Sequence, residues 1–305
     1  MTVGVMLAAC SVAVLIYFIH HSAAAIQADN VVATVSADLD TTIDRLFPEP
    51  VGRPAGAPTN AGLPEDFDTQ AVPVPAPRTG YLQTVDPDQL MRMAQHHDLV
   101  LRLSVRPGQF VLGGTPVALA WPPSRATEQI TRAAARAFTI GTQRTPSQDV
   151  EFGIWQLVEI AVRALSPGIN DPHTANACVD RLAATLARIG PRPLPESRRC
   201  DEDGRLRVVA DPVSKQSVVD AAFDEVRQAA ARSVSVTIRL LEAIRIVAPH
   251  ADGEMRRALQ AQASMIHHQS DAMAIDPRDL DDINARYSAA MAVLAPPIPR
   301  SVRTA

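Results

Sequence analysis

The first residues of the chain carry the feature that most restricts its fold. Residues Val3 to Ile19 read VGVMLAACSVAVLIYFI and contain no charged side chain. A run of this length is at the lower limit for a helix that crosses the hydrocarbon core of a bilayer. Tyr17 and the His20-His21 pair supply an end suited to the membrane interface. We therefore predict a transmembrane helix within residues 1–24.

Two processed forms are alternatives to this retained anchor. Ser22 to Ala25 are small residues of the kind found at signal-peptidase sites, and Leu7 to Cys10 is similar to a lipoprotein box. A secretory signal, however, normally starts with basic residues, and the first basic residue of this chain is Arg45. We predict a retained helix, with a secreted protein released near Ala25 as the alternative. Because no Lys or Arg flanks the segment, its charges predict no orientation.

Residues 25–47 have the pattern of an amphipathic helix that continues out of the membrane. Apolar residues recur at helical spacing between acidic residues. They are Val32, Val35, Leu39, Ile43 and Leu46. Such a face needs a partner surface. The partner is either the same segment of a second subunit, which would make a homo-oligomer, or the helical region of the same chain.

A proline-rich stretch and a small mixed unit follow this helix. Residues 48–78 have almost no periodicity and are predicted to form an extended linker. Residues 79–123 are predicted to form a small α/β unit, because short strand-like segments alternate with one helical segment. We expect strands at Tyr81–Val85 and Leu99–Val105, a helix at Pro87–His97, a turn at Arg106-Pro107-Gly108 and short strands up to Trp121.

The apolar residues of the next region, 124–295, have mainly helical spacing, which predicts a helical domain with one added strand at 205–210. Its first helix is expected to end near Gly141. The next two helices are expected to begin at Asp149 and, with Pro172 at the first helical position, at the capping residue Asp171. Residues 214–248 are expected to form one long helix. Residues 296–305 form a tail. The predicted fold class is therefore α+β and mainly α, with an N-terminal transmembrane helix, a small mixed α/β unit and a helical bundle.

The densest group of polar residues surrounds the turn S-P-G-I-N-D between two of these helices. Glu159 and Arg163 precede the turn at i and i+4, and Asn170, Asp171 and Thr174 follow it. One interpretation is a ligand-binding pocket of these five residues, in which Arg163 binds an anion placed by Asn170 or Asp171. The other is helix capping and ion pairing, which needs no ligand. The residue types favour the second interpretation.

Several kinds of chemistry find no support in the sequence. Acidic and basic residues are interspersed at a formal net charge of -4, so no nucleic-acid surface is predicted. The three cysteines lie far apart, and the adjacent histidines His267 and His268 would point about 100° apart on a helix, so no metal site is predicted. Nucleotide-binding, metalloprotease and serine-hydrolase motifs are absent. We predict no catalytic residue and no cofactor, and an enzyme is not expected.

The chain also carries segments that can be compared with a known family. They include VLIYFIHH, IQADNVVATVSADLDTTIDRLFP, LVLRLSVRPGQFV, RTPSQDVEFGIWQLVEIAVRALSPGINDPHTA and DGRLRVVA. Together they closely resemble the bacterial predicted membrane protein family that is defined by domain of unknown function 2254. The resemblance covers nearly the whole chain and implies that it corresponds to a C-terminal portion, starting inside the last of several transmembrane helices. It also implies a bacterial inner-membrane location with a cytoplasmic C-terminal region, and it implies no activity.

Three functions agree with these observations. The first is a non-enzymatic membrane protein that senses a ligand, assembles subunits or takes part in transport, with the lipid bilayer as its partner. The second is a membrane-tethered enzyme that uses the polar cluster between Glu159 and Asp171. The third is the secreted protein that cleavage near Ala25 would release.

Overall fold

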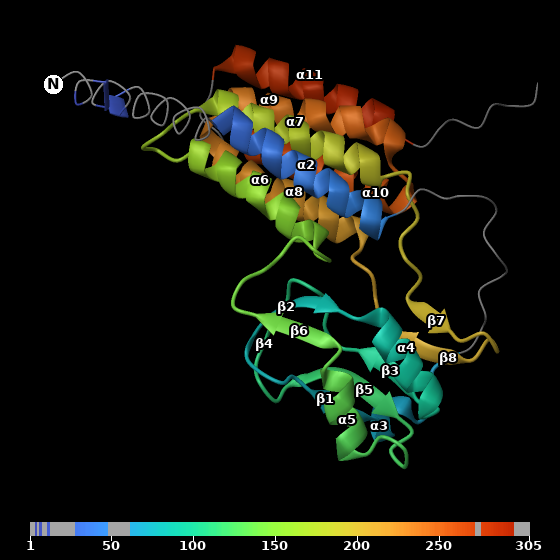
Figure 1. Cartoon of the computed structure of the whole chain (residues 1–305). Helices are drawn as coiled ribbons and strands as arrows, with labels where there is room; N and C mark the ends of the chain where they lie inside the picture. The colour runs from blue at the N-terminus through green and yellow to red at the C-terminus, as the bar shows by residue number, and fades with distance from the viewer. Residues whose placement is uncertain are drawn as a thin grey trace, which may run out of the picture.

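A computed structural model of the chain describes residues 4, 6, 7, 11, 12, 28–47, 62–271 and 276–295. A bundle of helices lies against a smaller unit of strands and short helices (Figure 1). The predicted fold class, α+β and mainly helical with a helical bundle, is confirmed. The chain passes between the two units after α2, after β6, after α7 and after β8, so each unit is built from separated segments.

The described helices of the bundle alternate in direction and enclose one apolar core. They are α2 (Ala28–Leu46), α6 (Val150–Ala164), α7 (Pro172–Ile189), α8 (Lys215–Ala229), α9 (Val234–Val247), α10 (Gly253–Asp271) and α11 (Pro277–Leu294). Short 3-10 turns, η1 (Ala230–Arg232) and η2 (Ala248–His250), follow α8 and α9. The helical spacing of Val, Leu, Ile and Ala places one face of each helix in this core.

Helix α2 packs its apolar stripe on its own chain. Val32, Leu39 and Ile43 are buried in the bundle core, together with residues of α6 and α7. The approach to α6 is close, because a Cβ built on Gly153 would lie 2.7 Å from Leu39 Cδ1. The apolar stripe is therefore covered by helices of the same chain. The exposed side of α2 carries residues such as Ala37 and Thr41.

The α/β unit contains two sheets around a second core. Its helices are α3 (Phe67–Gln70), α4 (Pro87–His96) and α5 (Glu128–Ala135). The five-stranded sheet has the order β1-β5-β3-β8-β7, and the three-stranded sheet has the order β4-β2-β6. Their strands are β1 (Val72–Pro75), β2 (Gly80–Val85), β3 (Val100–Leu103), β4 (Phe110–Val111), β5 (Pro116–Trp121), β6 (Phe138–Gly141), β7 (Arg198–Cys200) and β8 (Leu206–Val209).

Strand β8 is the strand expected at 205–210, and it joins the sheet of the α/β unit. Leu101 and Arg102 of β3 pair with Val208 and Val209 of β8 in parallel. A hydrophobic segment after α7 thereby returns to the first unit. This return places the connection from β8 to α8 at the junction between the units, beside the first turn of α6.

Three segments differ from the sequence-based expectations. The helix expected to reach Gly141 ends at Ala135, and Phe138–Gly141 forms β6, paired with β2; the α/β unit therefore continues beyond residue 123. Residues 214–248 are divided at Ser233, whose extended backbone separates η1 from α9. Part of the expected linker forms α3 and β1, where the prolines are tolerated because β1 is an edge strand.

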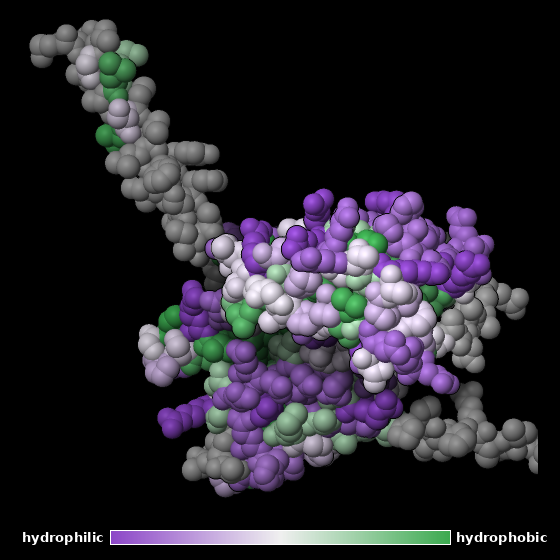
Figure 2. Space-filling model, turned by 90° about the horizontal axis from the view of Figure 1, so that it is seen from below, coloured by the Kyte–Doolittle hydropathy of each residue, from purple (hydrophilic) through white to green (hydrophobic). Residues whose placement is uncertain are grey.

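The membrane segment falls mostly outside the described part of the chain. Of the predicted transmembrane segment Val3 to Ile19, five residues are described. Among the described residues, no helix has the length and apolar character needed to cross a membrane. The predicted tail 296–305 also lies outside the described residues. Hydrophilic residues cover most of the face seen in Figure 2, and hydrophobic residues form small areas between them.

Candidate functional site

The main cavity found in the described part of the chain lies at the junction of the two units and has a volume of about 550 Å³. Each unit contributes one wall. From the bundle come the C-terminal end of α2, the first turn of α6 and the segment before α8. From the α/β unit come the end of β3, the turn that follows it and β7. We call this cavity the junction cleft. Its lining residues include Arg45, Phe47, Leu103, Val105, Arg106, Asp149, Val150, Glu151, Arg199, Asp211 and Val213.

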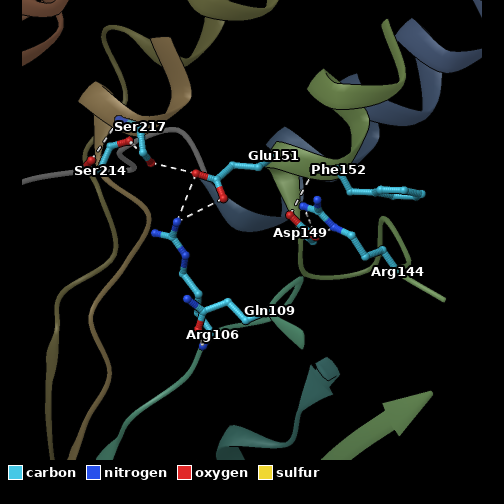
Figure 3. A network of polar contacts seen from close by, with 8 residues as sticks. All are labelled: Arg106, Gln109, Arg144, Asp149, Glu151, Phe152, Ser214 and Ser217. Carbon is cyan, nitrogen blue, oxygen red and sulfur yellow. Dashed lines mark hydrogen bonds and ion pairs between the residues drawn. The ribbon is translucent and has the colours of Figure 1, made fainter. Parts of the chain in front are cut away.

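One polar bridge joins the units across the junction cleft (Figure 3). Arg106, in the turn after β3, donates from Nη2 to both carboxylate oxygens of Glu151, at 3.2 and 3.1 Å. The Ser217 hydroxyl of α8 donates to Glu151 Oε1 at 2.7 Å. Gln109 Oε1 accepts from the Arg106 backbone N–H at 2.8 Å. Glu151 therefore connects three segments, and its charge is compensated by Arg106.

A second ion pair holds the beginning of α6. Asp149 caps the helix by accepting from Phe152 N at 3.0 Å, and it accepts from Arg144 Nε and Nη2 at 2.9 and 2.8 Å. Burial raises the pKa of Asp149, although the hydrogen bonds from Arg144 oppose this change. The Arg144 guanidinium also lies over the Phe152 ring, 5.4 Å from its centroid.

The turn after β3 approaches this ion pair closely at Gly108. Its backbone has φ of +92°, and a Cβ added there would lie 2.1 Å from Asp149 Oδ2. Gln148 connects the same region to β2, because its side-chain amide exchanges hydrogen bonds of 2.9 and 3.0 Å with the Val85 backbone. The α/β unit is thus docked on the first turn of α6 through side chains and backbone together.

The C-terminal end of α2 is held at the junction cleft by polar contacts. Thr42 Oγ1 donates to the Pro146 carbonyl at 3.1 Å. Asp44 pairs with Arg188 and Arg192 of the α7 region, and the two arginines lower its pKa. Arg192 Nη1 also donates to the Phe47 carbonyl at 2.8 Å. These contacts fix the end of α2 against the segment before α6 and against α7 and its C-terminal end.

Some charges that line the junction cleft are not compensated by neighbouring side chains. The Arg199 guanidinium is half-buried and forms no hydrogen bond or ion pair with any described residue. Arg45 makes one long hydrogen bond, of 3.4 Å, to the Pro146 carbonyl. Asp211 is exposed and has no ion pair within the described ranges. The two arginines leave several N–H donors available to a ligand.

The residues predicted from the sequence as a ligand site lie elsewhere, at the far end of the bundle. Arg163 donates to Glu159 at 2.6 Å, with 70% and 44% of the two side chains exposed. Asp171 caps α7, accepting from the His173 and Thr174 N–H groups and from the Thr174 hydroxyl. Asn170 has φ of 48°. None of the five lines the junction cleft, and their role in ligand binding stays a prediction.

Sequence reasoning did not single out the residues of the junction cleft. Arg106 was recognised as part of a turn, and Asp149 as the start of a helix, but nothing in their spacing relates them to Arg45 or Arg199. Gly108 in the R-P-G turn was a partial signal, since a glycine in a turn can mark a left-handed backbone conformation or a close approach of backbone to another element. The partner of that approach is set by tertiary packing.

His267 and Lys215 of the helical region are both engaged by neighbouring residues. His267 Nε2 lies 2.8 Å from Asn284 Oδ1, and its ring stacks on Tyr287. Lys215 is buried, donates to the Gly190 carbonyl at 2.7 Å and pairs with Asp252. Within the described ranges, no group of three or more His, Cys, Asp and Glu residues is arranged to hold a metal ion.

The fold and the junction cleft define a two-unit, mainly helical α+β protein. A family model described as "Predicted membrane protein (DUF2254)" matches residues 1–245, and the chain belongs to this family. The predicted family is thus confirmed. Uncharacterized proteins of Mycobacterium bovis and Mycobacterium tuberculosis are each 33% identical over 265 residues, which is 85% of this chain and 50% of each relative. The chain spans half the length of these relatives. No solved structure matches it.

Proposed function

We propose that the chain is a membrane-anchored, non-enzymatic sensing component, in which the junction cleft receives a ligand and α2 passes the change to the membrane segment. The anchor would be a transmembrane helix between Val3 and Ile19, in a bacterial inner membrane, with the region from α2 onward in the cytoplasm. The family description, predicted membrane protein, supports the location. An enzyme is the less supported alternative, because the polar residues of the cleft are largely engaged with one another.

One observation carries this proposal: α2 extends from the N-terminal segment to the junction cleft. Its first described residue, Ala28, follows the hydrophobic sequence. Its last residues, Arg45 and Leu46, line the cleft, as does Phe47, which follows the helix. A helix of this length is a stiff connection. Closing or opening the cleft would therefore move the helix that continues toward the bilayer.

A homo-oligomer through α2 stays a prediction. The apolar stripe of α2 is buried against its own bundle, so a second subunit would have to bind the exposed side, which carries Ala33, Ala37 and Thr41. The side chains on this surface are mostly small or polar, and an interface there would need additional contacts from other helices.

The coupling is tested with Glu151→Gln in membranes of expressing cells that were washed at alkaline pH. We expect the full-length chain to stay in the washed pellet. Because the substitution removes the charge that holds Arg106 but keeps the side-chain shape, we expect backbone amides near the end of α2 to exchange hydrogen several-fold faster. Hydrogen exchange with mass spectrometry measures this change.

Glu159→Gln is the matched control, since it removes an exposed charge from the same helix, away from the junction cleft. It should leave exchange at the end of α2 unchanged. Equal exchange at α2 in the Glu151 variant and in the wild type would contradict the coupling. A shortened chain in the soluble or exported fraction would contradict the anchor.

A further inference from the structure

We infer that the junction cleft binds a water-soluble organic anion, a phosphate or carboxylate with an apolar body, through Arg45 and Arg199. This inference rests on the proposed function and names the ligand class that it leaves open.

The charges favour an anion. Arg106 is paired with Glu151, and Asp149 is paired with Arg144, so these four groups largely compensate one another. Arg199 has no ion pair within the described ranges, and Arg45 is bonded only to a neutral carbonyl. Arg45 and the remaining acid, Asp211, are both exposed, so solvent and salt screen both charges, and the half-buried Arg199 is the least screened of the three. A half-buried guanidinium with free donors fits a phosphate or carboxylate, which can accept two parallel hydrogen bonds.

The apolar side chains that line the junction cleft favour a ligand that also has an apolar part. Leu46, Leu103 and Val213 are partly exposed in the wall of the junction cleft, together with several prolines. The volume of about 550 Å³ lies inside the range of roughly 300 to 1,000 Å³ that is typical of small-molecule sites. A bare inorganic anion would leave most of this apolar wall in contact with water. An anion with an apolar body would cover it.

The position argues for a soluble ligand rather than a lipid headgroup. Helix α2 has 19 residues, so at 1.5 Å per residue about 28 Å separates its beginning from its end at the junction cleft. In the proposed arrangement the membrane lies beyond the beginning of α2. A headgroup that remains in the bilayer would therefore not reach the arginines.

The test uses three probes on the full chain in detergent: phenyl phosphate, inorganic phosphate and benzyl alcohol. Isothermal calorimetry or a thermal shift measures binding. We expect phenyl phosphate to bind at least tenfold more tightly than either of the other two, since it alone combines the anion with an apolar body. Arg199→Gln should weaken it about tenfold, Arg45→Gln should weaken it less because Arg45 is exposed, and Asp211→Asn should change it little.

Arg205→Gln is the matched control, because Arg205 is an exposed arginine close to Arg199 in sequence and does not line the cleft. Equal affinity of phenyl phosphate for the Arg199 and Arg205 variants would overturn the inference. So would protection of the cleft by phosphatidylglycerol vesicles but not by phenyl phosphate, which would point to a lipid headgroup. An adventitious ion only, bound equally by wild type and all variants, would overturn it as well.

The two proposals fail separately. If phenyl phosphate binds through Arg199 but hydrogen exchange in α2 does not change, the ligand class stands and the coupling fails. If Glu151→Gln speeds exchange in α2 but no probe depends on the two arginines, the coupling stands and the ligand class fails.

Discussion

At the scale of single residues, Gly108 decides how the two units meet. Its φ of +92° lies in the left-handed region, which favours glycine, and its Cα faces the carboxylate of Asp149. A side chain here would meet the capping residue of α6 and the guanidinium of Arg144. The glycine thus permits the turn after β3 to rest on the start of a bundle helix.

Gly108→Ala is expected to lower the free energy of unfolding by about 2–4 kcal/mol, through backbone strain and through displacement of Asp149. Gly114→Ala is the control, since Gly114 has φ of +85° but nothing lies within 4 Å of an added Cβ. In this variant the free energy of unfolding should fall only by the cost of backbone strain, about 1 kcal/mol. Urea denaturation measures both. Similar losses in the two variants would mean that the approach to Asp149 contributes nothing.

The polar residues at the far end of the bundle belong to the same scale. Asp171 satisfies two N–H groups at the start of α7, and hydrogen bonds from Thr174 lower its pKa. These contacts are sufficient to account for an Asp before Pro172 in this sequence. The Glu159–Arg163 pair is exposed, so it contributes only modestly to stability.

At the scale of elements, the packing of α2 on α6 determines whether the end of α2 stays in the wall of the junction cleft. Leu39 fills the space left by the missing side chain of Gly153. Ion pairs from Arg188 to Asp40 and Asp44 connect α2 to α7 on its other side. Apolar contact brings the helix close, and these pairs define its position along the axis.

Gly153→Leu is expected to force α2 away from α6, at a cost of about 1–3 kcal/mol in the free energy of unfolding. Amides of α2 should exchange faster, while those of the α/β unit should change little. Gly168→Leu serves as control, because Gly168 has open space around it. Hydrogen exchange resolved to α2 tests this. Unchanged exchange in α2 would show that the helix is held by its ion pairs and does not depend on the close approach.

At the scale of the whole molecule, ion pairs stabilise both units and give them a common response to acid. Asp44 in the bundle and Asp98 and Asp201 in the α/β unit have lowered pKa values, chiefly because of hydrogen bonds from arginines. A lowered folded pKa contributes stability above the unfolded value of 3.8, and this stability is lost as the pH falls through the folded pKa. The pKa of Asp149 is raised, so this residue opposes the trend: its ionisation costs stability as the pH rises.

We therefore expect the free energy of unfolding to fall between about pH 5 and about pH 3, as measured by urea titrations. Arg188→Gln should reduce this fall, because the pKa of Asp44 then moves back toward 3.8. Arg136→Gln, which removes an exposed arginine without an ion pair in the described part of the chain, should leave it unchanged. A wild-type protein equally stable at both pH values would contradict the lowered pKa values of these aspartates.

The whole molecule also shows which features follow from neighbouring residues in the sequence and which depend on tertiary packing. The sequence alone determined the mainly helical class, the helix starts at Asp149 and Asp171, and the apolar stripe of α2, because helical spacing and capping depend on neighbouring residues. It did not distinguish β6 from a continued helix, since Phe138 and Ile140 suit either structure until β2 lies beside them. Only the tertiary structure brought Arg45, Arg106 and Arg199 to one cleft. They come from segments far apart in the chain, and their proximity depends on how the two units pack.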